Sequence, residues 1–167
     1  MVLTEPQITR YRHWLTRNRQ RTFDTYDALW QWSVTDLDGF WQSDWDYEIE
    51  SPTPPTQALA DARMPGAVWF PGTQLNYARQ VFRHADAAHG ADIPAILFRN
   101  EMLQDAGRTL SLSWSELRRE VASLAVALRG MGALHNDRVA AYLPNAPQTV
   151  VAFLACASLG AVWSVCS

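Results

Sequence analysis

The clearest hydrophobic pattern in the chain lies between residues 113 and 132, where apolar residues recur every three or four positions. This spacing places them on one face of an α-helix. The predicted helix begins with a capping box, because Ser113 can accept a hydrogen bond from the amide of Glu116 while the Glu116 side chain reaches back. Gly130 and Gly132 end the helix. Its apolar face consists of Leu117, Val121, Leu124, Ala125 and Leu128.

After this helix the pattern changes to continuous apolar runs. Residues 138–143 read RVAAYL and show no polar alternation after Arg138, which predicts a strand covered on both faces, as in a parallel sheet. A second helix is expected from Asn145, as its N-cap, to about Leu159. Because another apolar strand follows, the region predicts an α-β-α-β arrangement with a parallel crossover.

The last predicted strand, residues 160–167, reads GAVWSVCS and follows a helix that is apolar on nearly every face. Such a strand and helix need cover on more than one side, and this chain contains no further parallel strand to provide it. We therefore expect residues 160–167 to be interior strand of a larger sheet whose remainder lies outside this chain.

The N-terminal region predicts a helix rich in arginine. Five arginines and no acidic residue lie between Thr9 and Thr22, while Ile8, Tyr11 and Leu15 share one helical face. The arginines indicate either a nucleic-acid or membrane-surface patch or the solvated side of a helix. The solvated side is favoured because no nucleic-acid motif accompanies them.

Aromatic residues dominate the next segment. Thr35 is the expected N-cap of a helix with Asp36 and Asp38 in its first turn. The chain has eight tryptophans, and a tryptophan cluster could form a sugar-stacking platform or part of a core. Helical spacing favours the core. The apolar stripe consists of Leu37, Trp41 and Trp45, with Phe40 beside them.

The middle of the chain is divided by proline and glycine. Residues 51–56, SPTPPT, predict a connector, and two Pro-Gly pairs bracket a short extended piece at residues 67–70. A helix is expected over residues 75–84. Residues 94–101 and 108–114 predict two strands of a hairpin.

Composition excludes several kinds of chemistry. All 14 basic residues are arginine, so no lysine Schiff base or phosphate-loop lysine can come from this chain. Cys156 and Cys166 form no CxxC pair and are expected to be buried, reduced thiols and not zinc ligands. His84 and His89 have no metal-ligand spacing on a helix and are expected at the surface, so no metal site is predicted.

Charge and hydropathy limit the expected partners and location. The net charge of −3 gives no general attraction to nucleic acid or anionic membranes, and neither is expected as a partner. The N-terminus lacks the apolar core of a secretory signal, and the longest apolar run is too short to span a membrane. These features predict a cytoplasmic protein.

Three segments of the chain resemble AMP-forming acyl-CoA synthetases of the adenylate-forming superfamily. YDALWQWSVTDLDGFW, residues 26–41, is similar to the N-terminal extension of the acetyl-CoA synthetase branch. GAVWFPGTQLNYARQVFRH, residues 66–84, is similar to the W-F-x-G-x-x-L-N signature after it. Residues 113–167 resemble the first block of the main domain, and the motif WSVCS at 163–167 resembles the acetoacetate-activating type.

The resemblance implies an α/β fold. A helical N-terminal extension, residues 1–63, would precede the start of the AMP-binding (adenylation) domain, residues 64–167. That second part would hold a hairpin and the first βαβ part of a larger adenylate-forming domain that is incomplete in this chain.

The family reaction has two steps. A carboxylate attacks the α-phosphorus of MgATP to give an acyl-adenylate and pyrophosphate, and the coenzyme A thiol then displaces AMP. The resemblance thus implies ATP, Mg²⁺ and coenzyme A as cofactors of the parent enzyme, and acetoacetate or a related short acyl acid as its substrate. The phosphate loop and catalytic lysine are expected downstream of Ser167, so we assign no catalytic residue and expect this chain alone to be inactive and to bind the cofactors poorly.

Four residues near the end of the chain are candidates for the wall of the coenzyme A tunnel, because the equivalent segment of the family runs close to the pantetheine. The alternative is that they are ordinary core residues of a strand. A nucleophilic role for Cys166 is not expected, since no base accompanies it and the family forms no covalent enzyme intermediate. The four candidates are Trp163, Ser164, Cys166 and Ser167.

A second hypothesis makes the chain a non-catalytic homologue. An uncovered sheet edge between residues 139 and 167 would then mediate self-association or pairing with a full-length partner.

Overall fold

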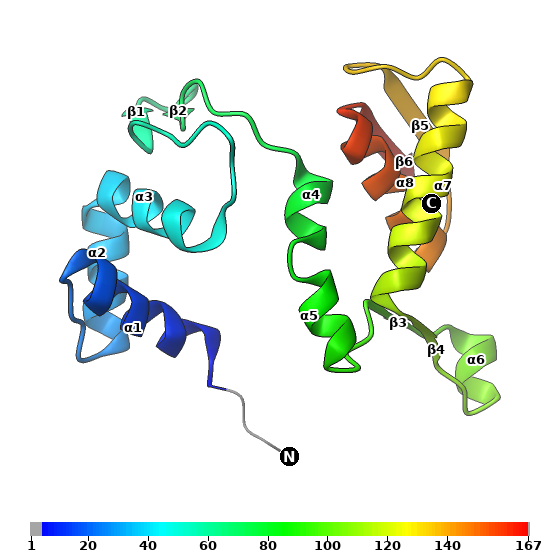
Figure 1. Ribbon diagram of the computed structural model, residues 1–167, viewed down its shortest axis with the longest axis horizontal. Coiled ribbons are helices and arrows are strands. Elements are labelled where there is room, and N and C mark those ends of the chain that lie inside the picture. The colour runs from blue at the N-terminus through cyan, green and yellow to red at the C-terminus, as the bar shows by residue number, and fades with distance from the viewer. Residues whose placement is uncertain (1–4, 167) are drawn as a thin grey trace. The chain divides into compact units, whose positions relative to one another are not determined.

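A computed structural model describes residues 5–166, which divide into two units on either side of Leu75 (Figure 1). The unit before this point is mainly helical, and the unit after it combines helices with strand pairs. The predicted domain boundary after residue 63 concerns the family's domains and stays a prediction.

The helical unit forms around aromatic side chains, as the amphipathic pattern predicts. Tyr11, Leu15, Leu29 and Trp32 are buried together, and Trp14, Phe23, Phe40 and Tyr47 pack against them. Of the predicted stripe, Trp45 is buried, whereas Leu37 and Trp41 are 38% and 39% exposed, so the tryptophan cluster contributes only in part to a core. The elements of this unit are α1 (Gln7–Arg19), α2 (Tyr26–Thr35), α3 (Leu37–Glu48), β1 (Leu59–Asp61) and β2 (Val68–Trp69).

The expected N-cap of α3 was wrong by one residue. Thr35 is the last residue of α2, and its hydroxyl donates to the carbonyl of Gln31. Asp36 caps α3 instead, because its carboxylate accepts from the amide of Gly39. The prediction placed the start of a helix at Thr35, but in the structure α2 ends there and a single residue, Asp36, separates it from α3.

The extended piece between the Pro-Gly pairs is confirmed as β2. It pairs antiparallel with β1, a strand that the sequence pattern did not predict. One carboxylate oxygen of Asp38, on α3, accepts from the amides of Ala58 and Leu59 at 2.8 Å each. This side chain ties the β1–β2 pair to the helical layer.

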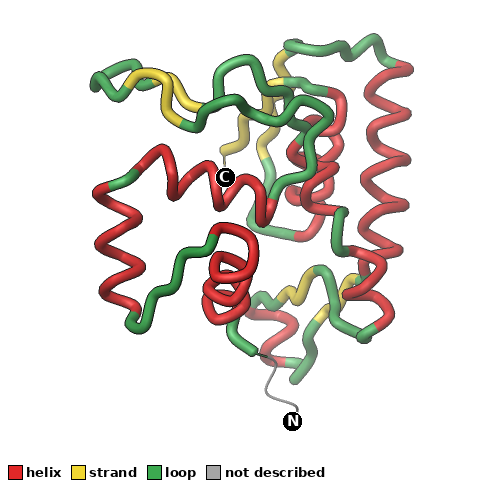
Figure 2. Tube along the Cα trace, turned by 60° about the vertical axis from the view of Figure 1, so that its left-hand side comes forward, coloured by secondary structure: helices red, strands yellow, loops and turns green. Residues whose placement is uncertain are grey.

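The second unit has a core of aliphatic residues between helices, and Figure 2 shows how short its strands are beside the helices. Leu112, Leu117, Val121, Val151 and Leu154 are buried in one cluster. The elements are α4 (Tyr77–Phe82), α5 (Ala85–Gly90), β3 (Ile96–Phe98), α6 (Glu101–Asp105), β4 (Leu110–Leu112), α7 (Trp114–Gly130), β5 (Arg138–Tyr142), α8 (Pro147–Leu159) and β6 (Val162–Cys166).

Most of the predicted elements of this unit are confirmed. β3 and β4 form an antiparallel hairpin, with α6 in the connection. The capping box at the start of α7 is present in both directions. β5 and β6 are parallel and joined by α8, in the register Arg138↔Val162 to Tyr142↔Cys166. The sequence therefore predicted the α/β class and the parallel crossover.

Two expectations about this crossover need correction. Asn145 does not cap α8: the N-cap is Ala146, and no side chain bonds the free amides there. The strands are also not covered on both faces by described residues, since Tyr142 is 80% exposed, Val162 52% and Val165 43%. An apolar sequence indicates a tendency to be buried, but it does not determine that the described residues cover both faces of the strands.

Gly160 makes the turn from α8 into β6. Its φ of +70° lies in the left-handed region, and an added Cβ would come 2.3 Å from Nδ1 of His135. Replacing Gly160 by alanine is expected to lower the free energy of unfolding by about 1 kcal/mol, since the exposed His135 ring can move aside but the backbone strain remains. Urea unfolding of the chain measures the change. Gly130→Ala, which meets open space at an ordinary φ, should be neutral or slightly stabilising, and equal losses in both variants would contradict this account.

Candidate functional site

The carboxyl ends of β5 and β6 lie side by side, because the strands are parallel and Tyr142 is opposite Cys166. In open α/β sheets, ligands bind beyond the carboxyl ends of the strands. Three of the four tunnel-wall candidates lie on β6, and Ser167 lies outside the described residues.

The pleat of the sheet separates these candidates. Side chains alternate across a strand, so Ser164 and Cys166 share one face while Trp163 is on the other. Ser164 and Cys166 are exposed, and Trp163 is half-buried. The structure therefore brings two of the candidates together and places the third on the opposite side.

The two cysteines differ in environment. Cys156 is buried in α8, and burial raises the pKa of its thiol, which makes it unreactive at neutral pH. Cys166 was expected to be buried, but it is exposed, and its Sγ lies 3.8 Å from the carbonyl oxygen of Ala141. Both thiols are free.

The groups that the family chemistry requires do not gather in this part of the chain. Within residues 5–166, no group of three or more His, Cys, Asp or Glu side chains could hold a metal ion. His84 and His89 are exposed, as the sequence predicted. The described residues therefore offer no preformed cluster of side-chain ligands for a metal ion. They also contain no helix long and apolar enough to cross a membrane.

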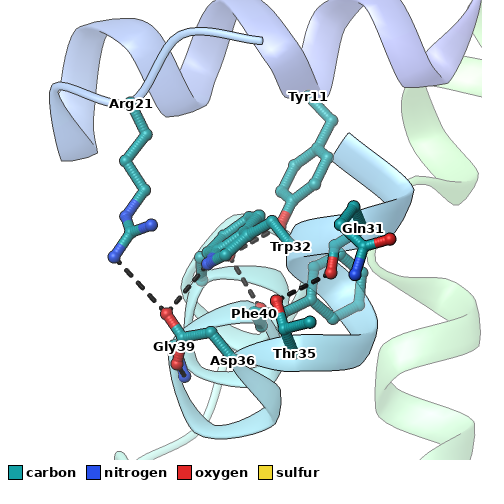
Figure 3. Close-up of polar contacts among 9 residues, drawn as sticks. Tyr11, Arg21, Gln31, Trp32, Thr35, Asp36, Gly39 and Phe40 are labelled. Atoms are coloured by element: carbon teal, nitrogen blue, oxygen red, sulfur yellow. Dashed lines mark hydrogen bonds and ion pairs between the residues drawn. The ribbon is translucent and has the colours of Figure 1, made fainter. Parts of the chain in front are cut away.

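A polar network joins the helices of the first unit around Asp36 (Figure 3). Its carboxylate accepts from Nε1 of Trp32 at 2.8 Å and from the amide of Gly39 at 3.0 Å, and Arg21 lies 3.4 Å away. The Trp32 bond is the first cause of a lowered Asp36 pKa, followed by the Gly39 amide. Gly39 leaves room for this carboxylate, since an added Cβ would lie 2.4 Å from it.

A cavity of about 270 Å³ opens between α1, α2 and α3. Asp44 and Glu48, one helical turn apart on α3, line it among aromatic rings. Asp44 is half-buried, and the resulting loss of hydration raises the pKa of its carboxyl, with a further increase from the Glu48 charge. Sequence analysis did not single out these residues. The available signal was an acid pair at i, i+4 on the same helical face as Phe40 and Tyr47.

Two families match successive parts of the chain. The family described as acetyl-coenzyme A synthetase N-terminus matches residues 26–81, and the family described as AMP-binding enzyme matches residues 82–167. Their order agrees with the order of the resembling segments.

Full-length relatives extend the comparison. The chain is 35% identical to an acetoacetyl-coenzyme A synthetase of Rhizobium meliloti over 99% of its length, and 38% identical to an acetyl-coenzyme A synthetase of Streptomyces avermitilis over 90%. These alignments cover 24% and 22% of the relatives. The structure of acetoacetyl-CoA synthetase from Streptomyces lividans matches with a TM-score of 0.82 and 43% identity over 95% of this chain and 24% of that one. The chain thus spans about a quarter of the proteins it matches.

Proposed function

Because the chain belongs to the family of AMP-binding enzymes, we propose that it forms the N-terminal part of a ligase that joins acetoacetate to coenzyme A. The reaction would proceed through an acyl-adenylate and release AMP and pyrophosphate. The observation that carries this proposal is the 43% identity to the Streptomyces lividans acetoacetyl-CoA synthetase across 95% of the chain. The 38% identity to the acetyl-coenzyme A synthetase of Streptomyces avermitilis makes acetate the alternative candidate for the substrate.

The chain would form part of the enzyme's fold, and the residues that bind and activate ATP would lie elsewhere. It contains no lysine, and its described residues contain no cluster of three or more His, Cys, Asp or Glu side chains that could hold a metal ion. ATP and Mg²⁺ would therefore bind elsewhere in the whole enzyme. A cytoplasmic location is part of the same proposal.

A chimera tests the substrate. This chain would replace the matching quarter of the Streptomyces lividans enzyme, and AMP release would be measured with ATP, coenzyme A and either acetoacetate or acetate. Acetoacetate-dependent release by the chimera, with none from the chain alone, is the expected result. Robust release by the chain alone would contradict the proposed dependence on further polypeptide, and a preference for acetate would contradict the substrate.

The exposed β6 face would form part of the coenzyme A tunnel in the whole enzyme. In the chimera, Ser164→Leu is expected to raise the KM for coenzyme A about tenfold while leaving acetoacetate-dependent ATP–pyrophosphate exchange unchanged, because only the second step uses the thiol. Steady-state kinetics and exchange assays measure the two steps. Val165→Ile, on the opposite face of the strand, is the control. An equal loss in both steps would indicate a structural role and not a tunnel wall.

The second candidate function is self-association. It is favoured by the exposed apolar residues of the β5–β6 pair, Tyr142, Val162 and Val165. Size-exclusion chromatography with light scattering tests it on the chain. A concentration-dependent dimer that is dispersed by Val162→Glu, on the same face as Tyr142, would support it, and a monomer at all concentrations would exclude it.

A further inference from the structure

The cavity between α1, α2 and α3 is lined by aromatic rings from all three helices. Tyr11, Phe40 and Tyr47 lie close together, with the ring centroid of Tyr11 6.3 Å from that of Phe40 and 5.1 Å from that of Tyr47. Tyr26 and Trp30, one turn apart on α2, also line it and are 65% and 51% exposed. Exposed apolar side chains that gather beside a cavity mark a candidate site for a ligand.

The charge of the cavity has one sign. Among the described residues that line it, Asp44 and Glu48 are acidic and none is basic. Glu48 accepts a hydrogen bond from Gln7, whereas the side-chain carboxylate of Asp44 makes no hydrogen bond or ion pair with any other described residue. An unpaired, half-buried carboxylate is costly to the fold, and a cation beside it would offset that cost.

We propose that this cavity binds a small organic ammonium cation, with the aromatic rings around the alkylated nitrogen and the two carboxylates supplying the opposite charge. The negative faces of aromatic rings attract such cations, and rings grouped into a cage are the usual means of recognising quaternary ammonium groups. A volume of about 270 Å³ accommodates a ligand of this size. The site uses no residue of the β5–β6 sheet, so its test does not depend on the proposed ligase activity.

The partial burial of Asp44 makes it possible to distinguish a role in ligand binding from a role in stabilising the fold. Without ligand, its carboxylate is unfavourable at neutral pH, because its pKa is raised by burial and by Glu48. Asp44→Asn should therefore raise the free energy of unfolding at pH 7 while weakening cation binding. If Asp44 only stabilised the fold, Asp44→Asn would instead lower the free energy of unfolding at pH 7.

Choline is the probe, and its neutral isostere 3,3-dimethyl-1-butanol, which has carbon in place of nitrogen, is the control ligand. Titration of the 167-residue chain is followed by the indole NMR signal of Trp30, which Trp30→Ala identifies. We expect a saturable shift with choline at a Kd of about 1 mM, and none with the alcohol. Asp44→Asn should weaken binding about tenfold, and Asp24→Asn, which removes an exposed acid outside the cavity, should leave it unchanged.

Three results would overturn the proposal. Equal binding of the alcohol would show a merely apolar pocket. Undiminished binding by Asp44→Asn, or no saturable shift up to about 30 mM choline in a chain that circular dichroism shows to be folded, would exclude the cation site. Tighter binding of N-acetylarginine amide than of choline would assign the cavity to an arginine side chain of another protein instead.

Discussion

Replacing Leu154 by alanine is expected to lower the free energy of unfolding by about 3 kcal/mol. Leu154 is 2% exposed on α8 and lies in the buried cluster with Leu117, Val121 and Val151. Truncation removes apolar contacts and leaves a cavity that the surrounding helices fill only in part. Such a loss is a large share of the stability of a small domain.

Urea unfolding followed by circular dichroism measures this effect, and Val150→Ala is the matched control. Val150 precedes Val151 on the same helix but is 38% exposed, so the same kind of truncation should cost well under 1 kcal/mol there. Equal losses at the two positions would mean that α8 does not pack against α7 through the face that carries Val151 and Leu154.

The two long helices and the strands of the second unit were predictable because local signals and long-range packing agree, whereas the short helices α5 and α6 were not predicted. The capping box at Ser113, the αL glycine at position 160 and the apolar run at 138–143 each specify a local conformation, and the parallel register of β5 and β6 is compatible with all of them. Where signals conflicted, prediction failed. Asn145 is a good capping residue, yet Ala146 occupies the N-cap of α8, where Pro147 begins the helix.

The first unit was less predictable because its key contacts join distant residues. β1 is only Leu59–Asp61, too short for a periodic signal, and depends on Asp38 from α3 for hydrogen bonds to its start. The cavity beside Asp44 was not predicted from the sequence for a similar reason. It exists only once three helices meet, and no spacing within one helix indicates that a carboxylate is left without a partner.

The same limit applies to the β6 candidates. The apolar pattern placed Trp163, Ser164 and Cys166 in one strand, but the pleat puts Trp163 on the face opposite the other two. Period-two alternation could have indicated this separation. Exposure could not be read from the sequence, because it depends on which layers cover the sheet.

Asp36→Ala is expected to destabilise the chain by about 2 kcal/mol, because one carboxylate serves two helices. About 1 kcal/mol comes from losing the N-cap of α3, and a similar amount from leaving Nε1 of the buried Trp32 without its acceptor (Figure 3). The Arg21 pair adds little, since both side chains are more than 40% exposed. Urea unfolding at pH 7 measures the total.

The pH dependence of this effect distinguishes the charged carboxylate from a simple cap. The pKa of Asp36 is lowered from 3.8 in the folded chain, so its charge stabilises the fold at pH values above 3.8 and loses that contribution as the pH falls through the lower, folded value. The difference in unfolding free energy between the parent and Asp36→Ala should thus shrink in acid.

Asp36→Asn is the matched variant, because its amide oxygen can still accept from Gly39 but carries no charge. It should lose about half as much stability as Asp36→Ala, and its stability relative to Asp36→Ala should not change with pH over the same range. If Asp36→Asn is as unstable as Asp36→Ala, the charge-assisted bond from Trp32 dominates and the cap contributes little. If neither variant is destabilised, the junction between α2 and α3 is held by the aromatic core alone, and the network around Asp36 has no energetic role.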